Sequence, residues 1–516
     1  MKYYKDICAE VFSQHEKSVD YKNTYGNKGL YEQIKQNKYF YSGDQWKGAK
    51  VGKQKPLVTH NIIKRIGEYK TAVIGGDEVE ISFLPVGVNS QLESEKPIDF
   101  SNKKVSGAEV ALAANAVSKY LNTYFKKIHF NDTVCKALKN AYISGCSVVY
   151  TYWDSSEKTG LYVDDERTVE ICGDIKSEVI DIENVDFYDP NNTEINEQEY
   201  IIISSRRTVA SLIREAKQNK MPKEMIDKIK PDFSNENEAF YSQKATVLTK
   251  FFKVYDKDGN YTIKAIRVCK DAIIKPEWDL KLKHYPLAVF CWEENGNIFS
   301  ESEITNLIPN QIAINRMMTA NTWAVMMNGM PLMLVNADLV DEAITNEPGQ
   351  IIRFYGSGED FERSVKYITP PQFVENFDSP IANLIQNTLN ATGATDAALG
   401  TIKAENTSAI ESVKQSARLP LTIIKKRYLS FIESIAEIYL EFILNMYFTR
   451  PLIQKENNKT HYFNFVAERY KNYAFYCEAN IVSKREEDFN SLLKEIENLD
   501  KHDKAEIKEF LGGDKK

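Results

Sequence analysis

Carboxylates that could do chemistry gather in one stretch of this 516-residue chain, Asp186-Phe187-Tyr188-Asp189-Pro190-Asn191-Asn192-Thr193-Glu194. Such a group could bind calcium or serve as a general acid and base. The stretch lacks the central glycine and the terminal glutamate of an EF-hand loop, so a solvated turn after a strand is the simpler interpretation. The six histidines (15, 60, 129, 284, 461 and 502) never fall into HExxH or another short ligand spacing. We therefore predict no metal and no catalytic centre.

Phosphate-binding motifs and paired cysteines are also missing from the sequence. There is no GxxxxGK[ST] loop and no GxGxxG after a strand, and Gly356-Ser357-Gly358-Glu359 is interpreted as a polar turn. The seven cysteines (8, 135, 146, 172, 269, 291 and 477) are widely spaced and form no CxxC pair. This pattern favours buried reduced thiols and a reducing cytoplasm. We expect no enzyme activity and no cofactor.

Composition and charge narrow the class further. With 43% hydrophobic and 27% charged residues, the chain is typical of a globular protein of roughly three domains or one elongated molecule. The net charge of −7 argues against sequence-independent binding to nucleic acid, which depends on Lys and Arg. The N-terminus MKYYKDICAEVF has no apolar signal region, and no run reaches about 18 apolar residues, so we expect no contact with a membrane.

The elements that must position any site are predicted from periodicity and stop signals. The first part of the chain is predicted to be mainly helical. A helix over Leu30–Phe40 ends at Gly43, and a helix over Asn61–Ile74 ends at Gly75-Gly76 and is followed by the strand Val79–Leu84. A longer helical stretch, Ala108–Ser144, has a break near His129–Asp132 and ends at Gly145. From Val148 the runs VVYTYW, LYV, TVEIC, VIDI and YIIIS predict strands, and Asp256-Lys257-Asp258-Gly259-Asn260 predicts a hairpin turn. This region is expected to be a mixed sheet with helices packed on it.

The C-terminal half is predicted to be mainly helical. A helix is predicted over residues 301–328, followed by a small β-α-β-β pattern and by a second helix that starts at Ser379-Pro380 and ends at Gly393. Ser408 and Glu411 form a capping box that opens a helix to about Tyr447, which Pro420 should kink. One strand, YAFYCEANIV, and a charged helical tail complete the prediction.

Basic residues are distributed unevenly over these two helices. There is no Lys or Arg from Pro371 to Ile402, and only Arg316 is basic from Glu293 to Gly329. Both helices carry many asparagines. Two buried core helices would explain the lack of cations, but a surface that packs against copies of itself and faces a polyanion it must not hold fits the polar content better.

In four ordered blocks the sequence resembles the portal proteins of tailed bacteriophages, most closely those of long-tailed phages of Gram-positive hosts. The blocks are YFYSGDQW with KPLVTHNIIKRI, IENVDFYDPNNTEINEQEYIIISSRRTVASLI, the helix–β-α-β-β–helix segment of about residues 301–391, and ATGATDAALGTIKAENTSAIESV. Together they span about residues 30–450. The short C-terminus departs from the family pattern and leaves the extent of its crown domain open.

The resemblance implies an α+β, mostly helical portal fold that assembles into a ring. Its parts would be a mixed-sheet wing (1–285, with a strand at 474–482), stem helix 1 (286–328), a β-α-β-β clip (329–371), stem helix 2 (372–391), a tunnel loop (392–407), a long kinked helix (408–450), and a last segment (451–516) that holds the wing strand and a short crown. Tyr39, Phe40, Tyr41 and Trp46 would be packing aromatics at the start of the wing, and Pro420 would shape the long helix.

The same resemblance implies a conduit for packaging and ejecting DNA at one capsid vertex, with no enzyme activity. The expected partners are copies of the chain in a ring, commonly a dodecamer, together with double-stranded DNA in transit, terminase, capsid or scaffold protein, and a head–tail connector. The expected location is the virion, after synthesis in the host cytoplasm. Tunnel-loop residues facing DNA would be Asp396, Thr401, Lys403, Glu405 and Asn406, and clip residues for partners would be Asp338, Asp341, Glu342 and Glu347. Another phage structural ring or adaptor protein, or a DNA-packaging enzyme, remains the alternative.

Overall fold

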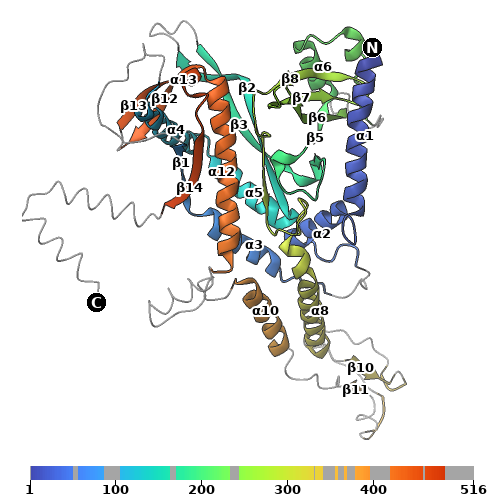
Figure 1. Cartoon of the computed structure of the whole chain (residues 1–516). Coiled ribbons are helices and arrows are strands. Elements are labelled where there is room, and N and C mark those ends of the chain that lie inside the picture. The colour runs from blue at the N-terminus through green and yellow to red at the C-terminus, as the bar shows by residue number, and fades with distance from the viewer. Residues whose placement is uncertain are drawn as a thin grey trace, which may run out of the picture. The chain divides into compact units, whose positions relative to one another are not determined.

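The chain, seen here as a computed structural model, divides into two compact units that are described separately (Figure 1). Unit 1 comprises Met1–Lys38, Gly67–Thr305 and Arg418–Lys516, and unit 2 comprises Tyr39–Ile66 and Asn306–Ala417. The predicted α+β class is confirmed, because helices and strands both occur throughout the described residues. Those residues are 2–49, 56–86, 105–162, 170–232, 243–329, 332–336, 338–340, 355–357, 359, 365–368, 378–394, 419–456 and 459–482.

The first elements follow the sequence pattern closely. The predicted helices and strand near Leu30, Asn61 and Val79 correspond to α2, α3 and β1. The long helical stretch breaks as predicted, because His129 adopts a φ of 51° between α4 and α5. Helix α1 has no counterpart among the predicted elements. The bounds are α1 Lys2–Thr24, α2 Leu30–Ser42, α3 Ile62–Gly75, β1 Glu78–Pro85, α4 Gly107–Lys127 and α5 Phe130–Ser144.

Gly145 ends α5 at a position where only glycine fits. Its φ is +89°, a left-handed conformation that other residues adopt at a cost. A Cβ atom built there would lie 1.9 Å from the carbonyl oxygen of Ser300. The chain therefore turns from α5 directly into the first strand of a three-stranded sheet, with the order β3-β2-β9. Its strands are β2 Cys146–Tyr162, β3 Glu170–Asp181 and β9 Leu287–Cys291.

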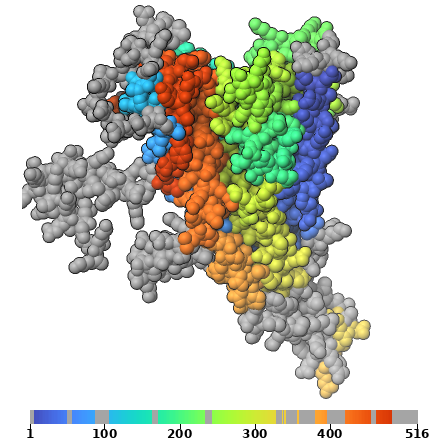
Figure 2. Space-filling model, in the orientation of Figure 1, coloured from blue at the N-terminus to red at the C-terminus, as the bar shows by residue number. Residues whose placement is uncertain are grey.

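A five-stranded sheet with the order β4-β5-β6-β7-β8 forms the second layer of unit 1. The predicted hairpin is confirmed, since Tyr255 pairs with Tyr261 across Asp256–Asn260. Cys8 and Val11 of α1 pack against buried side chains of this sheet, and Figure 2 shows α1 (blue) beside its green strands. The bounds are η1 Ile182–Asn184, β4 Val185–Phe187, η2 Ile195–Glu197, β5 Tyr200–Thr208, α6 Val209–Gln218, α7 Lys223–Ile226, β6 Lys244–Tyr255, β7 Tyr261–Val268 and β8 Ile273–Asp279.

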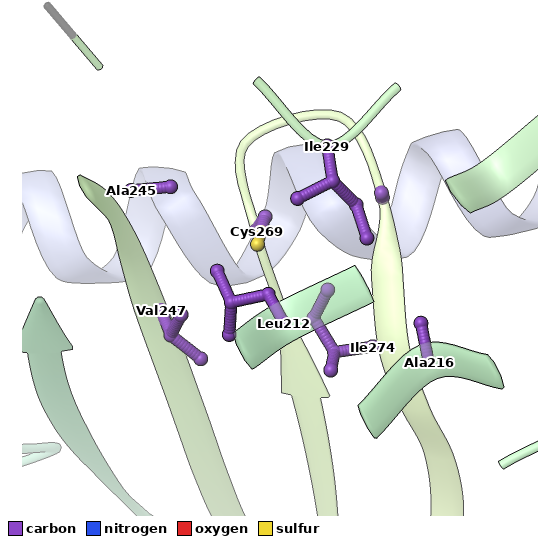
Figure 3. Packing of buried hydrophobic residues seen from close by; sticks show 8 residues of the cluster. Leu212, Ala216, Ile229, Ala245, Val247, Cys269 and Ile274 are labelled. Atoms are coloured by element: carbon purple, nitrogen blue, oxygen red, sulfur yellow. The ribbon is translucent and has the colours of Figure 1, made fainter. Parts of the chain in front are cut away.

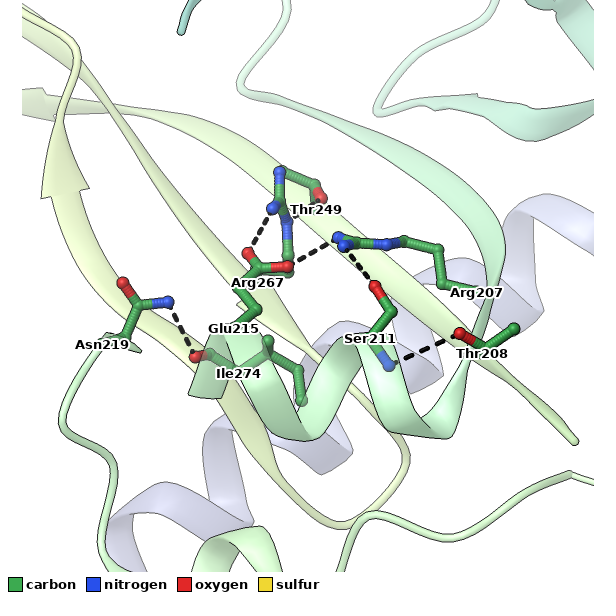
Figure 4. A network of polar contacts seen from close by, with 8 residues as sticks. All are labelled: Arg207, Thr208, Ser211, Glu215, Asn219, Thr249, Arg267 and Ile274. Atoms are coloured by element: carbon green, nitrogen blue, oxygen red, sulfur yellow. Dashed lines mark hydrogen bonds and ion pairs between the residues drawn. The ribbon is translucent and has the colours of Figure 1, made fainter. Parts of the chain in front are cut away.

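Helix α6 packs on this sheet through an apolar cluster and a polar network. Leu212 and Ala216 are fully buried against Val247 and Ile274 (Figure 3). Beside them, the Glu215 carboxylate bonds to both Arg207 and Arg267 (Figure 4). Burial alone raises the pKa of Glu215, but the two guanidinium groups outweigh it and lower that pKa. The helix is thus fixed to the sheet by both kinds of contact.

The region predicted to be the wing contains several small sheets. Every strand pairing in the described part of the chain is antiparallel, and the strands of the wing region fall into separate sheets. The physical reason is connectivity. Neighbouring strands such as β6 and β7 are joined by tight turns, whereas a parallel pair needs a crossover connection.

The end of unit 1 contains more strands than predicted. Instead of one strand after the long helix, β12 and β13 pair with each other and β14 pairs with β1. Charged residues and Pro451 interrupt the apolar alternation of β12, which hides it from a pattern search. The predicted strand near residues 474–482 is β14. The bounds are α12 Leu421–Met446, β12 Thr449–Glu456, β13 Lys459–Val466, α13 Ala467–Tyr470 and β14 Phe475–Val482.

Pro420 lies in an exposed turn directly before α12. From Leu421 this helix runs for 26 residues, about 39 Å, and buries eleven side chains. The predicted helical start at Ser408 lies outside the described residues. A kink at Pro420 therefore stays a prediction.

Unit 2 is built on two helices and a strand pair. The two predicted helices are α8 and α10, and Gly393 follows α10 with the expected positive φ of 75°. The outer strands of the predicted β-α-β-β unit form the antiparallel pair β10–β11. Residues 337 and 341–344 of its predicted helix, and residues 350–354 of its middle strand, lie outside the described residues. The bounds are α8 Glu303–Gly329, β10 Leu332–Val335, β11 Val365–Ile368 and α10 Asp378–Thr392.

Candidate functional site

The helix pair of unit 2 is the candidate site, because it carries the uneven charge seen in the sequence. Between Asn306 and Met326, α8 has a single charged side chain, the exposed Arg316. Residues 379–392 of α10 have none. The exposed positions of α10 are small or neutral: Ser379, Pro380, Ala382, Asn383, Asn387, Asn390 and Ala391. A neutral amide surface offers hydrogen bonds to phosphate without the counterion exchange that makes binding tight.

A ladder of polar side chains fixes the extended segment 58–62 to α8. Gln311, Asn315 and Thr319 lie four residues apart, on one face of the helix. Thr319 Oγ1 accepts from Val58 N–H (3.1 Å), Asn315 Oδ1 from His60 N–H (3.1 Å) and Gln311 Oε1 from Ile62 N–H (3.0 Å). Three backbone donors of the segment are thereby satisfied outside any sheet.

The buried members of this ladder also bond to one another. Gln311 Nε2 donates to His60 O (2.6 Å) and to Asn315 Oδ1 (2.9 Å), and Asn315 Nδ2 donates to Gln45 Oε1. Only 2% of Gln311 and 3% of Asn315 is exposed. The polar content of α8 is therefore partly structural. Asn315, which the sequence grouped with a polyanion-facing surface, faces inward instead.

The aromatic stretch that begins at Tyr39 supports the same segment. Phe40 and Tyr41 are buried, whereas Tyr39 and Trp46 are partly buried. Trp46 Nε1 donates to Val58 O (3.2 Å), and Asn61 Nδ2 donates to Tyr41 O (3.0 Å). Contacts group residues 39–66 with α8 and α10 in unit 2. The assignment of these aromatics to the wing stays a prediction.

A hydrogen bond between side chains joins the two helices of the site. Asn310 Nδ2 donates to Thr388 Oγ1 (3.3 Å), and Thr388 in turn donates to Leu384 O within α10. Ile381 and Leu389 of α10 are buried, as are Leu307 and Ile314 of α8. The asparagines thus serve two roles, since Asn310 links the helices while Asn383 and Asn387 are exposed.

The start of α8 is anchored within unit 1 by a buried ion pair. Glu303, its first residue, lies 2.6 Å from Lys70 Nζ through Oε1 and accepts from Trp292 Nε1 (3.0 Å) through Oε2. Ser302 donates to Tyr142 O (2.6 Å), and Thr305 Oγ1 accepts from Gln33 and Asn37. The sequence gives no signal for this anchor, because its residues are isolated from one another along the chain.

Most of the predicted site residues lie outside the described residues. This holds for the tunnel-loop positions Asp396, Thr401, Lys403, Glu405 and Asn406 and for the clip positions Asp341, Glu342 and Glu347. Asp338 is exposed in a turn after β10, and its N–H bonds to Asn336 Oδ1 (3.1 Å). These assignments stay predictions.

The acidic stretch near Asp186 is only in part the predicted solvated turn. Asp189 and its neighbours form an exposed turn in which Asp189 Oδ1 accepts from Asn191 N–H. Asp186 itself is 1% exposed and contacts Lys22 Nζ (2.6 Å) and His15 Nδ1 (2.5 Å). The stretch thus contributes a buried ion pair that holds α1 against β4.

Unit 1 also contains a cavity of about 1260 Å³. Its charged lining is largely paired: Lys38 with Glu183, and Arg207 and Arg267 with Glu215. In the described ranges no three His, Cys, Asp or Glu side chains cluster as a metal site would require. None of the helices in the described part of the chain is both long and apolar enough to span a membrane.

The ladder yields a test of its own. Replacing Gln311 with Ala removes the side-chain oxygen that accepts from the buried Ile62 N–H and the side-chain amide that donates to His60 O. Ile62 N–H keeps its other acceptor, His60 O (2.9 Å). We expect unfolding of unit 2 to become easier by about 1–2 kcal/mol, since each lost hydrogen bond contributes about 0.5–1.5 kcal/mol. Hydrogen exchange at Ile62 should accelerate accordingly.

Gln386→Ala is the matched control, because Gln386 is partly exposed on α10 and bonds only weakly, to Asn390 at 3.4 Å. It should change stability by less than about 0.5 kcal/mol. Equal exchange rates at Ile62 in the wild type and in Gln311→Ala would show that the ladder does not hold the segment.

Comparison with known proteins identifies one family. Residues 25–459 match the family model described as "Phage P22-like portal protein". This match includes the ladder, both helices of unit 2 and most of unit 1. A search of curated proteins found no match.

Proposed function

We propose that this chain, which belongs to the family of P22-like phage portal proteins, forms a ring at one capsid vertex through which the genome is packaged and ejected. The family match over residues 25–459 carries the proposal, and the neutral surface of α8 and α10 supports it. The same ring serves as the docking platform for terminase and for a head–tail connector. The protein has a structural role, and DNA passes through its channel.

The charge of the chain suits passage of DNA. A ring of twelve copies would carry 12 × −7 = −84 formal charges. Each Lys or Arg contact to phosphate would add an attraction that moving DNA must break. Helices whose described exposed residues are uncharged except for a single arginine provide few such contacts. The tunnel-loop residues around Lys403 are the proposed points of brief contact with DNA.

Closure of a ring requires two different complementary faces on each copy. The C-terminal end of α8 offers one candidate, because Val325 is 66% exposed and Met326 is 45% exposed. Neighbouring apolar side chains on a helix with few charges favour burial against another protein surface. We assign this patch to contact with a second copy of the chain. Beyond it along the chain, the strand pair β10–β11 and Asp338 belong to the proposed docking region.

Electron microscopy of the purified, untagged protein tests the proposal. End-on views are expected to show rings with a central channel of about 20 Å or more, wide enough for a DNA duplex. Val325→Lys should reduce the fraction of rings strongly, because it places a charge in the proposed contact between copies. The matched control is Val86→Lys, since Val86 is 54% exposed in unit 1.

The outcomes separate the alternatives. Rings in the wild type and in Val86→Lys, with few in Val325→Lys, would support both the ring and the contact. Rings unaffected by Val325→Lys would refute the contact but keep the ring. Monomers that hydrolyse ATP or cleave DNA would overturn the structural role in favour of a packaging enzyme.

A further inference from the structure

Two of the seven cysteines face each other across a strand pair in unit 1. Cys146 is the first residue of β2 and Cys291 is the last of β9, and the register of the two antiparallel strands places them directly opposite. They are 145 positions apart in the sequence, so the sequence alone gives no sign of the pairing. The other five cysteines have no such partner in the described strand pairings.

The two cysteines occupy a non-hydrogen-bonded position of the antiparallel strand pair, where opposite side chains lie closer together than at hydrogen-bonded positions. Gly145 and Trp292 lie directly opposite each other, next to the two cysteines, and Trp292 N–H donates to Gly145 O (2.8 Å). At the other end of the strand pair, Thr151 N–H donates to the opposite residue, Pro286, at its carbonyl oxygen (2.9 Å). Because hydrogen-bonded and non-bonded pairs alternate along an antiparallel ladder, Cys146 and Cys291 form a non-hydrogen-bonded pair. The Cα atoms of such pairs are about 4.5 Å apart, which lies within the range of about 4.4–6.8 Å seen for disulfides.

Both sulfur atoms also lie near the same carbonyl group. Cys146 Sγ donates to Ile298 O at 2.7 Å, and Cys291 Sγ contacts that oxygen at 3.7 Å. Ser300 N–H donates to Cys146 Sγ at 3.2 Å. Burial opposes ionisation of Cys146, but the hydrogen bonds from Cys291 and Ser300 lower the pKa of its thiol. The two thiols are therefore held side by side, with Cys146 the readier to act as a thiolate.

We propose that Cys146 and Cys291 form a disulfide bond when the protein meets a small-molecule disulfide. Cys291 is partly exposed, whereas Cys146 is buried, so the reagent reaches Cys291 first. The Cys291 thiol loses its proton as its sulfur attacks one sulfur of RS–SR and releases RS⁻. The Cys146 thiolate then attacks Cys291 Sγ, which forms the protein disulfide and releases the second RS⁻. The two thiol protons end on the two released thiolates as RSH, and the two electrons reduce the reagent.

The bond would brace the strand pair that supports the start of α8. Cys291 directly precedes Trp292, whose indole donates to Glu303. In a reducing cytoplasm both thiols stay free, whereas particles released into oxidising surroundings would acquire the bond. This inference does not depend on ring formation.

Peptide mapping after oxidation tests the proposal on the full-length protein. Reduced protein is incubated with oxidised glutathione, denatured, alkylated and digested. The expected result is a cross-linked peptide pair containing Cys146 and Cys291. The exposed Cys135 and Cys172 serve as internal controls for access of the reagent. The proposal is overturned if Cys146 and Cys291 are both alkylated while Cys135 and Cys172 carry glutathione, or if either is linked to another cysteine.

Thermal unfolding gives a second readout. Oxidation should raise the unfolding temperature of unit 1 by roughly 5–10 °C, and reductant should reverse the rise. Cys172→Ala should keep this response and Cys291→Ala should lose it. A rise of equal size in Cys291→Ala would overturn the assignment.

Discussion

Replacing Asp186 with asparagine is expected to destabilise unit 1 by about 3–5 kcal/mol, because it leaves the Lys22 ammonium buried without its counter-ion. Lys22 is 0% exposed, and its remaining hydrogen bond is to Glu183 O (3.0 Å). Its pKa is lowered because burial removes its hydration, an effect that the nearby Asp186 charge only partly offsets. Helix α1 should detach from β4 first, which thermal unfolding and hydrogen exchange in α1 would detect.

A double variant distinguishes loss of the ion pair from general damage at the site. Asp186→Asn combined with Lys22→Met removes both charges, so it should recover much of the loss. Asp258→Asn, in the exposed hairpin turn, should stay within about 0.5 kcal/mol of the wild type. If the double variant is no more stable than Asp186→Asn, the ion pair is not the cause.

The same carboxylate predicts a pH dependence. Burial raises the pKa of Asp186, but the hydrogen bond with His15 and the charge of Lys22 outweigh it and hold the pKa below its usual range. A carboxyl whose folded pKa is lowered contributes stability above its unfolded pKa of about 3.9. That contribution is lost as the pH falls through the folded pKa. The stabilities of the wild type and Asp186→Asn should therefore differ from pH 7 to about pH 4 and converge only as the pH falls below about 3.9.

Replacing Glu303 with alanine is the second change with a large expected effect, also about 3–5 kcal/mol. It leaves Lys70, which is 6% exposed, without a counter-ion and removes the acceptor of the Trp292 indole. It also removes a carboxylate from the N-terminus of α8, where the helix dipole favours negative charge. We expect a lower unfolding temperature and a smaller yield of rings in electron micrographs.

Glu301→Ala is the matched control, since Glu301 is exposed two residues earlier and changes the net charge equally. It should leave both stability and ring yield near the wild-type values. Because assembly itself stabilises a protein, the unfolding temperatures must be compared at one oligomeric state and one concentration. Equal losses in Glu301→Ala and Glu303→Ala would point to net charge rather than to the buried pair.

Local signals in the sequence predicted much of the fold correctly. Helix stops at Gly43, Gly145 and Gly393 coincide with positive φ values, and the break at His129 lies where the polar residues interrupt the helical pattern. The hairpin between β6 and β7 was predicted from Asp256–Asn260. These features depend on backbone conformations that one or two residues control, so they are visible without knowledge of the tertiary structure.

Pairing between distant segments was not predictable in this way. The β2–β9 and β1–β14 pairs join residues more than a hundred positions apart, and β12 was hidden by its charges and Pro451. The amide stripe of Gln311, Asn315 and Thr319 was visible as a spacing of four, yet its partner in segment 58–62 was not. Sequence spacing gives the face of a helix but not what covers it.

The sequence by itself determined many of the helix and strand boundaries, the weakly charged helices of unit 2 and the resemblance to portal proteins, because each rests on the order of residues within a short window. Only the tertiary structure decided which polar groups are buried. Asp186, Glu303 and Gln311 look like ordinary surface residues in the sequence. Each is buried because a distant partner, Lys22, Lys70 or the backbone of segment 58–62, compensates for its lost hydration. That compensation depends on spatial proximity, which the order of residues alone does not specify.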